Sequence, residues 1–478
     1  METMMGILGA GARLRRGCVA FATAVALTLP AVAAKADNLA DALIGAYNSS
    51  GLLEQNRALL RASDEDFAIA VSRLRPIIDY TVSMTQNYSG SALTSSRFNS
   101  RTTSPMAARL SLTWTLLDNG VRFYGIEQAR ETILATRQDL IAIEQQVLLR
   151  ATAAYVNVLL QTDSVNLQRN NLRVLGEELR AAQDRFDVGE VTRTDVALAE
   201  SRVAGARNNL TTAQGNLMSA QAEYQAVVGR RIGRLAGQPR LPASPSSLEA
   251  AVALAVRTHP TILAAQHRVK AAEMAVKGAS AGLGPTVTLG ADAGVSEDVG
   301  SSGYGRDGSI TLQLNQRIYQ GGGLAAGVRR TMATRDAARG ALLTAQRDVV
   351  QDVNDAYVRM QSARSSLVAS AEQVRAAQVA FDGIREEATL GARTTLDVLS
   401  AEQELLNAMT AQISARSEES IAAYQLLAAQ GLLTAEKLRL KVAIYDPTAY
   451  FNMVKSAPAA ISKQSRQLDS VLKRLGKK

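Results

Sequence analysis

One long stretch of this sequence occurs twice. The segment Arg185–Glu200 returns as Glu387–Glu402, at an offset of 202 residues. The same offset relates Gly189 to Gly391, Thr192 to Thr394, Asp195 to Asp397 and Gly229 to Gly431. A chain that contains two copies of one long unit usually folds as one architecture rather than as separate domains. The repeat therefore overrides the prior of about three domains that a length of 478 residues suggests.

The first 36 residues are typical of a secretory signal peptide. An apolar run, Val19–Leu29, follows three arginines, and Ala34–Ala36 offers small residues for cleavage before Asp37. The one cysteine, Cys18, lies in this leader and precedes the apolar run. We therefore expect an exported mature chain without a disulfide or a lipid anchor. Removal of the leader lowers the formal net charge from +9 to about +6, a modest excess that does not indicate nucleic-acid binding.

Four short segments alternate apolar and polar residues. They lie at about 77–88, 107–117, 285–296 and 309–319, and a Ser- and Thr-rich loop, 89–104, joins the first two. Strands of about ten residues with this alternation can cross a bilayer at a tilt, although two soluble amphipathic hairpins show the same pattern. Four strands cannot close a barrel, and open edges are not viable in lipid. Several chains must then share one barrel, with eight strands in a dimer or twelve in a trimer.

The longest segments carry helical periodicity. A helix from Val121 to Phe186 would be about 100 Å long, and shorter helices return from each turn to complete hairpins at 121–228 and 322–430. The seven-residue apolar repeat shifts by four residues at the same place in both copies, which locally unwinds a supercoil, although long helices also drift in register. We divide the mature chain into a first repeat, a linker, a second repeat and a weakly ordered basic tail, at 37–236, 237–247, 248–435 and 436–478.

Two enzyme-like patterns are accidental matches. Ser280 has the spacing of a nucleophile elbow, but that motif needs a strand before it and a helix after it. The glycines of 303–308 have the spacing of a dinucleotide fingerprint, but they precede a strand. With two histidines and no cysteine in the mature chain, the sequence offers little for metal or triad chemistry. We predict that the protein is not an enzyme and binds no cofactor.

The paired turns contain the most informative acidic residues. Asp195 and Asp397 each follow a glycine and a threonine in the pattern of a helix N-cap with a capping box, and capping alone would explain them. In a trimer the same residues would form a ring of carboxylates that favours cations and pairs with Arg193 or Arg393 to hold a pore shut. Both interpretations can hold together.

Several aromatic residues lie in or beside the predicted strands. Tyr80, Trp114 and Tyr319 are the candidates for a girdle at the membrane interface, and ordinary strand packing is the alternative.

The predicted strands end in LLDNG (116–120) and IYQGG (318–322), and the hairpin tips read RFDVGEVTRTDV and LGARTTLDVL. In these motifs and in its repeat, the chain resembles the TolC family of outer-membrane efflux and secretion channels over about 37–435. The resemblance implies an α+β membrane protein, in which a homotrimer forms a twelve-stranded β-barrel in outer-membrane lipid and a long α-helical coiled-coil barrel through the periplasm. It also implies two partners, a periplasmic adaptor (membrane fusion) protein and an inner-membrane transporter of the RND or ABC type.

The resemblance assigns roles to particular positions. Asp397 matches the pore-constricting acidic position, Arg393 the linked basic position and Asp195 the acidic partner in the first repeat. Two departures are Ser400, where a second acidic ring is expected, and Ala388, where a tyrosine is expected. The helix tips that would meet the adaptor comprise Val188, Gly189, Thr192, Leu390, Gly391 and Thr394.

Together these features predict the outer-membrane channel of a tripartite efflux pump or a type I secretion system. The channel would open at its periplasmic tips under the action of adaptor and transporter. The alternative is a structural coiled-coil protein of the envelope without channel activity.

Overall fold

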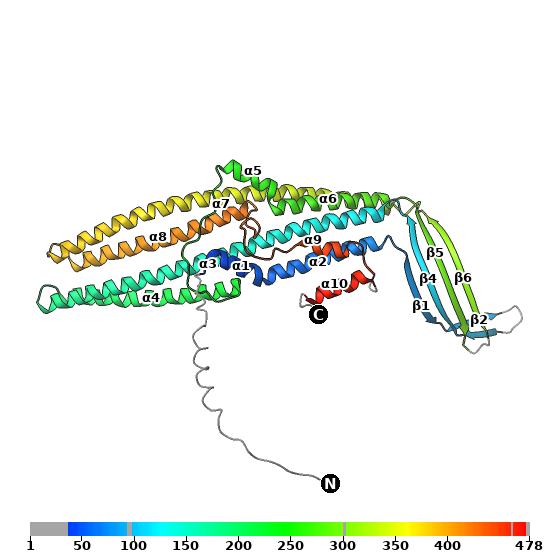
Figure 1. Ribbon diagram of the computed structural model, residues 1–478, viewed down its shortest axis with the longest axis horizontal. Coiled ribbons are helices and arrows are strands. Elements are labelled where there is room, and N and C mark those ends of the chain that lie inside the picture. The colour runs from blue at the N-terminus through cyan, green and yellow to red at the C-terminus, as the bar shows by residue number, and fades with distance from the viewer. Residues whose placement is uncertain (1–36, 93–97, 300–302, 460–461, 475–478) are drawn as a thin grey trace, which may run out of the picture.

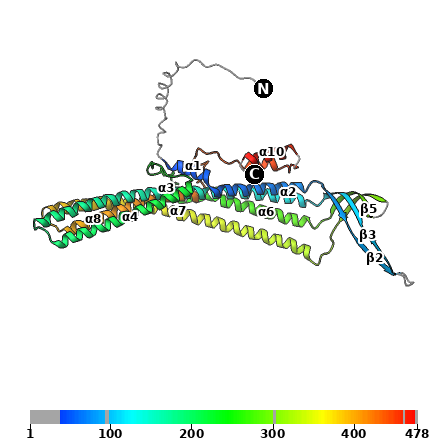
Figure 2. The same cartoon turned by 90° about the horizontal axis from the view of Figure 1, so that it is seen from below.

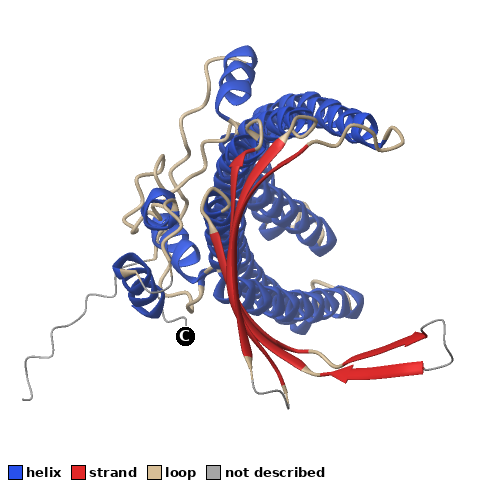
Figure 3. Ribbon diagram, turned by 90° about the vertical axis from the view of Figure 1, so that its right-hand side faces the viewer, coloured by secondary structure: helices blue, strands red, loops and turns tan. Residues whose placement is uncertain are grey.

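The computed structural model describes residues 37–92, 98–299, 303–459 and 462–474, so the predicted leader lies outside the described residues. Long helices make up one end of an elongated molecule and a sheet makes up the other (Figure 1). Viewed from the sheet end, the long helices form an open arc (Figure 3). Among the described helices, none is both long enough and apolar enough to cross a membrane.

Two helical hairpins form the body of the molecule. The first consists of α3 (Val121–Asp187) and α4 (Arg193–Val228), and the second of α7 (Gly323–Thr389) and α8 (Thr395–Ala429). The 67 residues of α3 correspond to about 100 Å. The shorter helices bury an alanine at every seventh residue, and such small side chains let two helix backbones approach closely along a coiled-coil seam. These alanines are Ala199, Ala206, Ala213 and Ala220 in α4 and Ala408, Ala415 and Ala422 in α8.

Shorter helix pairs complete each repeat. In the first repeat α1 (Leu39–Ser49) is followed by α2 (Gly51–Ser72), and Ser50 caps the second helix. In the second repeat α5 (Leu248–Thr258) is followed by α6 (Pro260–Ala281), where Pro260 occupies the first helical position. The helix breaks thus fall where Ser50 and His259–Pro260 predict them, because a cap residue or a proline starts a new helix there.

A glycine with positive φ lies at the end of α4 and another just after α8, and both permit close packing. Gly229 (φ +81°) follows α4, and a Cβ added there would lie 2.5 Å from the Cβ of Ser49. Its repeat counterpart Gly431 (φ +76°) follows α8, and a Cβ there would lie 2.9 Å from the Cα of His259. Both glycines therefore hold the end of a hairpin against the break in the shorter helix pair of the same repeat.

We expect Gly431→Ala to lower the free energy of unfolding by about 2 kcal/mol, because the substitution combines a left-handed backbone with overlap on the backbone of His259. Gly205→Ala is the matched control. Gly205 lies within α4 and an added Cβ would meet nothing within 4 Å, so alanine should stabilise the helix by about 1 kcal/mol. Thermal unfolding followed by far-UV circular dichroism measures both, and shifts of the same sign would contradict the prediction.

The sheet joins the two repeats. Its four antiparallel strands have the order β1-β4-β5-β6, with bounds Ile77–Met84, Pro105–Leu117, Thr286–Asp298 and Tyr304–Asn315. The sheet is visibly curved (Figure 3). β1 and β6 are its edges, and each pairs with one other strand of the described chain.

The loop predicted at 89–104 is largely a strand pair. β2 (Asn87–Ala92) and β3 (Phe98–Thr103) form a two-stranded antiparallel ribbon that extends the hairpin beyond the main sheet. The predicted first strand, at about 77–88, accordingly divides into β1 and the start of β2. The loop prediction is wrong because main-chain pairing continues through a segment whose Ser and Thr side chains do not alternate with apolar ones.

The two faces of the sheet differ in chemistry. On one face, Tyr80, Leu110, Ile310 and Leu312 are exposed. On the other face, the guanidinium of Arg109 in β4 donates to Asp292 in β5 and to Asp307 in β6, at 2.9 Å each. The Arg109 side chain therefore links three neighbouring strands through charge-assisted hydrogen bonds.

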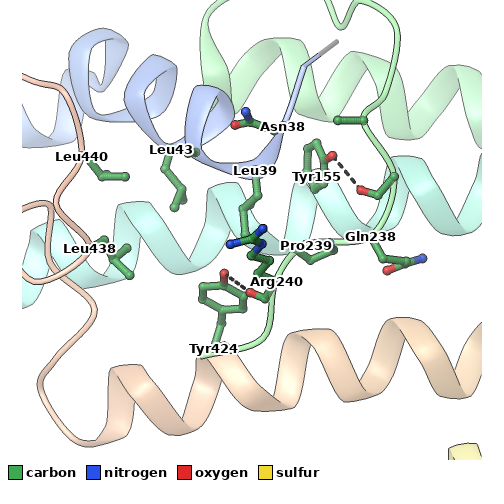
Figure 4. A pocket seen from close by; sticks show the side chains of 13 residues that line it. Asn38, Leu39, Leu43, Tyr155, Gln238, Pro239, Arg240, Tyr424, Leu438 and Leu440 are labelled. Carbon is green, nitrogen blue, oxygen red and sulfur yellow. Dashed lines mark hydrogen bonds between the residues drawn. The ribbon is translucent and has the colours of Figure 1, made fainter. Parts of the chain in front are cut away.

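The largest apolar core lies where the N-terminal segment, the linker and the C-terminal segment meet α3 (Figure 4). The hydroxyl of Tyr155 donates to the carbonyl oxygens of Asp37 and Gly237 at 3.2 and 2.9 Å, and that of Tyr424 donates to Arg240 at 2.9 Å. Burial raises the pKa of Tyr155 to about 12, so this hydroxyl stays protonated and able to donate. These bonds fasten the linker to α3 of the first repeat and to α8 of the second, beside a cavity of 370 Å³.

In the described parts of the tail, 436–459 and 462–474, the chain forms two helices, so the expectation of a weakly ordered tail is wrong for those parts. The helices are α9 (Pro447–Val454) and α10 (Lys463–Arg474). Tyr450, Val454 and Leu468 pack together with Ala68 of α2. In Figure 2, α10 and α7 lie on opposite sides of α2. A few apolar side chains at helical spacing are enough to dock this basic segment on α2. They are hard to recognise in the sequence because charged and polar residues surround them.

Candidate functional site at the hairpin tips

The ends of both hairpins are tight glycine turns. In the first, Gly189 has φ +83° and the amide of Glu190 donates to the carbonyl of Arg185 at 2.9 Å. In the second, Gly391 has φ +77° and the amide of Ala392 donates to Glu387 at 2.9 Å. A left-handed residue satisfies the last carbonyls of the long helix and reverses the chain within a few residues.

Asp195 and Asp397 form capping boxes, as the sequence pattern predicts. The amide of Asp195 donates to Thr192 Oγ1 at 3.3 Å, and Thr192 donates through its amide and hydroxyl to Asp195 Oδ2 at 2.9 and 2.7 Å. Thr394 and Asp397 repeat this geometry at 3.3, 3.0 and 2.8 Å. These hydrogen bonds from threonine lower the pKa of both carboxyl groups, so both carry a full negative charge at neutral pH.

Arg393 has a carboxylate partner within its own turn. Its Nε lies 2.7 Å from Glu387 Oε2, and this ion pair closes the base of the second turn. Its positive charge lowers the pKa of Asp397 only as a lesser cause, after the hydrogen bonds from Thr394. Within one chain, Arg393 therefore bridges the turn and does not bond to Asp397.

The tips also expose large apolar side chains. Val188 and Leu390 follow the long helices directly and are 72% and 78% exposed. They are repeat counterparts, so each hairpin ends in the same combination of an exposed apolar residue, a left-handed glycine and a capped carboxylate.

The two departures from the family pattern have local roles. The hydroxyl of Ser400 donates to the carbonyl of Leu396 at 2.7 Å within α8. Ala388 is buried in an apolar cluster with Phe381 and Val398. Neither position contributes a charge or a phenol to the tip.

Two of the three candidate girdle residues lie near the helix end of the sheet, and Tyr80 lies within the paired strands. Trp114 donates from Nε1 to the carbonyl of Leu74 at 3.0 Å, at the end of the sheet next to α2. Tyr319 lies four residues beyond the end of β6 and is 83% exposed. Tyr80 pairs with Leu110 within the strands and is exposed on the apolar face.

A buried acidic residue lies close behind the tips, and the sequence pattern did not single it out. Glu402 of α8 is buried, and it lies between the two hairpins with Glu178 of α3 and Arg202 of α4 as charged neighbours. Glu178 is paired with Arg385 of α7 at 3.2 Å. The correspondence of Glu200 with Glu402 was visible in the repeat, but a sequence alone does not show which of the two is buried.

The comparison with known families identifies this architecture. The model of a family described as "Outer membrane efflux protein" matches residues 46–230 and 251–432, one stretch in each repeat. The chain belongs to the outer membrane efflux protein family. The resemblance to the TolC family inferred from the tips and strand ends is thereby confirmed.

Individual relatives agree with this family. The chain is 36% identical over 429 residues to the outer membrane efflux protein BepC of Brucella suis, covering 88% of this chain and 91% of that protein. It is 27% identical to the outer membrane protein TolC of Escherichia coli, covering 84% of each.

Solved structures share the fold of this outer membrane efflux protein. A crystal structure of CusC superimposes with a TM-score of 0.74 at 16% identity, covering 83% of this chain and 92% of that one. The Campylobacter jejuni CmeC outer membrane channel gives a TM-score of 0.73 at 15% identity, covering 88% and 90%. Identities this low show the fold alone.

Membership settles the broad function. The protein is an outer-membrane efflux or secretion channel that extends into the periplasm, and it is not an enzyme. The alternative of a structural envelope protein without channel activity is therefore wrong. The long helices, the four-stranded antiparallel sheet and the two repeats are the fold of this family.

Proposed function

We propose that three copies of this chain form one duct, in which the sheets close a twelve-stranded barrel in the outer membrane and the helical hairpins form a tube through the periplasm. The observation that carries the proposal is the curved sheet whose edge strands, β1 and β6, each pair on one side only within the described part of the chain. An open edge is not stable in lipid, and pairing β1 of one copy with β6 of the next fills both.

The two faces of the sheet fit this arrangement. The apolar face with Tyr80, Leu110 and Ile310 faces lipid, and the face with Arg109, Asp292 and Asp307 lines the water-filled lumen. Trp114 and Tyr319 lie at the helix side of the sheet and anchor it at the membrane interface, whereas Tyr80 meets lipid within the strand.

The tips form the constriction in this proposal. Asp195 and Asp397 of three chains supply a ring of six carboxylates that favours cations, and the capping boxes keep these groups ionised. Arg393 acts by holding Glu387 and thereby the shape of the second turn. The exposed pairs Val188–Gly189 and Leu390–Gly391, with Thr192 and Thr394, dock a periplasmic adaptor protein, which links the duct to an inner-membrane transporter of the RND or ABC type.

The names of relatives point to both kinds of transport system. One relative is the alkaline protease secretion protein AprF of Pseudomonas aeruginosa, 27% identical over 63% of this chain, and another is the efflux protein BepC. We propose that the duct serves a tripartite efflux pump or a type I secretion system. A passive duct carries whatever its transporter delivers.

Single-channel conductance in planar bilayers tests the gate. We expect a small cation-selective conductance from the wild type, and in Asp397→Asn or Asp195→Asn a cation-to-anion permeability ratio lower by about tenfold, because the ring concentrates cations at the constriction. Thr394→Val is the control, because it removes the cap and retains the charge.

The outcomes separate the two roles of the aspartates. Selectivity that is unchanged in both aspartate variants would leave them as helix caps only. Selectivity lost equally in Thr394→Val would assign the effect to the shape of the turn. Absence of conductance from inserted trimers would contradict the duct itself.

A further inference from the structure

The two hairpins of one chain are joined near their tips by an apolar contact. Leu399 of α8 is 2% exposed and packs with Leu175 of α3 and Val203 of α4. On the other side of α8, Phe381 and Leu405 pack with Val174 of α3. Any movement that separates the second hairpin from the first must open this contact and expose its apolar surface.

Glu402 interrupts the apolar contact with a carboxyl group. It is 7% exposed and lies one turn of α8 beyond Leu399. It borders a cavity of 150 Å³ between α3, α7 and α8, where Asn170, Asn171 and Gln378 supply polar side chains. The surroundings of Glu402 therefore hold it out of bulk water and leave room for a little water near it.

The charged groups around Glu402 come from three other helices. Glu178 of α3 is a like charge, and Arg385 of α7 bonds to Glu178 at 3.2 Å. Among the described residues, Arg202 of α4 is the opposite charge that acts on Glu402. Burial, and after it the charge of Glu178, raise the pKa of Glu402 from 4.5 to about 7, and Arg202 offsets part of this rise.

The internal repeat shows that this arrangement is not a general feature of the hairpins. Glu200 is the counterpart of Glu402 and is exposed on α4. The counterpart of Glu178 is Ala380, which carries no charge. Between the hairpins of one chain, a buried glutamate therefore has a partly buried glutamate as its neighbour. At the matching positions of the other repeat, the glutamate is exposed and its neighbour is an alanine.

We propose that Glu402 and Glu178 form a proton-sensitive contact between the two hairpins of each chain, such that protonation stabilises the closed tips and deprotonation favours their separation. This inference rests on the proposed function, in which separation of the hairpins opens the duct. It adds a second group that regulates the same gate, one that lies further along the hairpins from the turns than Asp195 and Asp397.

The direction follows from proton linkage. The closed contact binds the proton more tightly than a separated, hydrated hairpin does, so the closed state gains as pH falls through about 7. The ratio of closed to open tips rises by up to about tenfold per chain for each pH unit between about 7 and 5. Asp195 and Asp397 remain ionised throughout this range, since their pKa values lie below the ordinary value of 3.8.

Spin-label distances between the hairpins test the contact without relying on conductance. The mature chain has no cysteine, so Glu190→Cys and Ala392→Cys, both at exposed turn positions, can be labelled selectively. We expect the population of separated tips to be at least about tenfold larger at pH 7.5 than at pH 5.5. In Glu402→Gln, a neutral side chain of the same size, the tips should stay closed at both pH values.

Two further variants complete the design. Glu200→Gln is the matched control and should behave as the wild type. Glu178→Gln removes the like charge and should move the midpoint of the transition to lower pH. This variant still tests the contact if Glu402→Gln assembles poorly. Single-channel open probability on the same proteins should follow the label distances.

Each result decides one question. A wild-type pH response that persists in Glu402→Gln, or a midpoint unmoved in Glu178→Gln, overturns the proton-sensitive contact. Label distances that respond as expected in trimers without conductance leave the contact in place and contradict the proposed duct.

Discussion

A chain that ends at Val442 is expected to lose the docking of α2 and to disappear from the outer membrane. The removed segment buries Tyr450 and Val454 against α2, and Phe451 packs on Phe67 with ring centroids 5.2 Å apart. Burial of such side chains is worth about 1.5–3 kcal/mol each, or about 8 kcal/mol for the segment with Leu468. A loss of this size matches the whole stability of an ordinary domain.

The same segment also makes hydrogen bonds that a shorter chain would lack. Tyr450 donates to Glu65 at 2.7 Å, and Arg75, next to the start of β1, donates to the carbonyls of Ser456 and Ala457, the latter at 2.7 Å. The tail therefore fixes the end of α2 at the point where the helices give way to the sheet.

The melting temperature of the purified protein and its amount in outer-membrane fractions measure this effect. A chain that ends at Ala459 is the control, since it loses α10 and the contact of Leu468 and keeps α9. We expect that chain to melt only a few degrees lower. Equal melting temperatures for full-length protein and the chain ending at Val442 would show that the tail contributes no stability.

Arg109→Glu is expected to prevent insertion of the sheet. The substitution places three carboxylates together where Arg109 now bonds to Asp292 and Asp307 at 2.9 Å each. Two attractions become two repulsions, a change of about 4 kcal/mol per chain after allowance for the half-exposed side chain. Because the residue bridges β4, β5 and β6, the repulsion acts across three strands at once.

The amount of folded protein in outer-membrane fractions measures insertion, and two further variants serve as controls. Arg306→Glu changes another arginine of the sheet, one that lies over the ring of Tyr304 at 5.1 Å, and should insert normally. Combining Arg109→Asp with Asp292→Arg reverses one pair and should restore part of the insertion. Normal insertion of Arg109→Glu would show that the strands pair without this ion-pair cluster.

The hairpins were predictable because their information is local. A glycine followed three residues later by threonine and then by aspartate specifies a turn and a capped helix, and it occurs at Gly189 and again at Gly391. Alternation predicted the four sheet strands for a similar reason, since each has one apolar face. The last one was predicted at about 309–319, whereas β6 spans Tyr304–Asn315, because the alternation of apolar residues continues in the sequence to Ile318 beyond the last paired residue. The turn-and-cap pattern and the alternation occur in both copies, so few other arrangements of helices and strands fit the sequence.

The features that sequence analysis missed depend on contacts between distant segments. Nothing in the tail shows that Tyr450 will meet Ala68, which lies far away in the chain. Glu402 and Glu200 occupy matching positions, and only the packing of α8 on α3 buries the first. The partner of Arg393 is Glu387 because the Gly391 turn brings those two residues face to face.

The order of strands in the sheet has a consequence for how the protein is made. β4 pairs with β5, and the bond between Arg109 and Asp292 joins residues 183 positions apart. Contacts of this range form slowly, since a long stretch of chain must first be brought together. β4 therefore waits for its partner until the whole first hairpin has emerged, and until then its unpaired edge can bind other chains. A protein built in this way depends on chaperones that bind the unpaired strands between export and assembly.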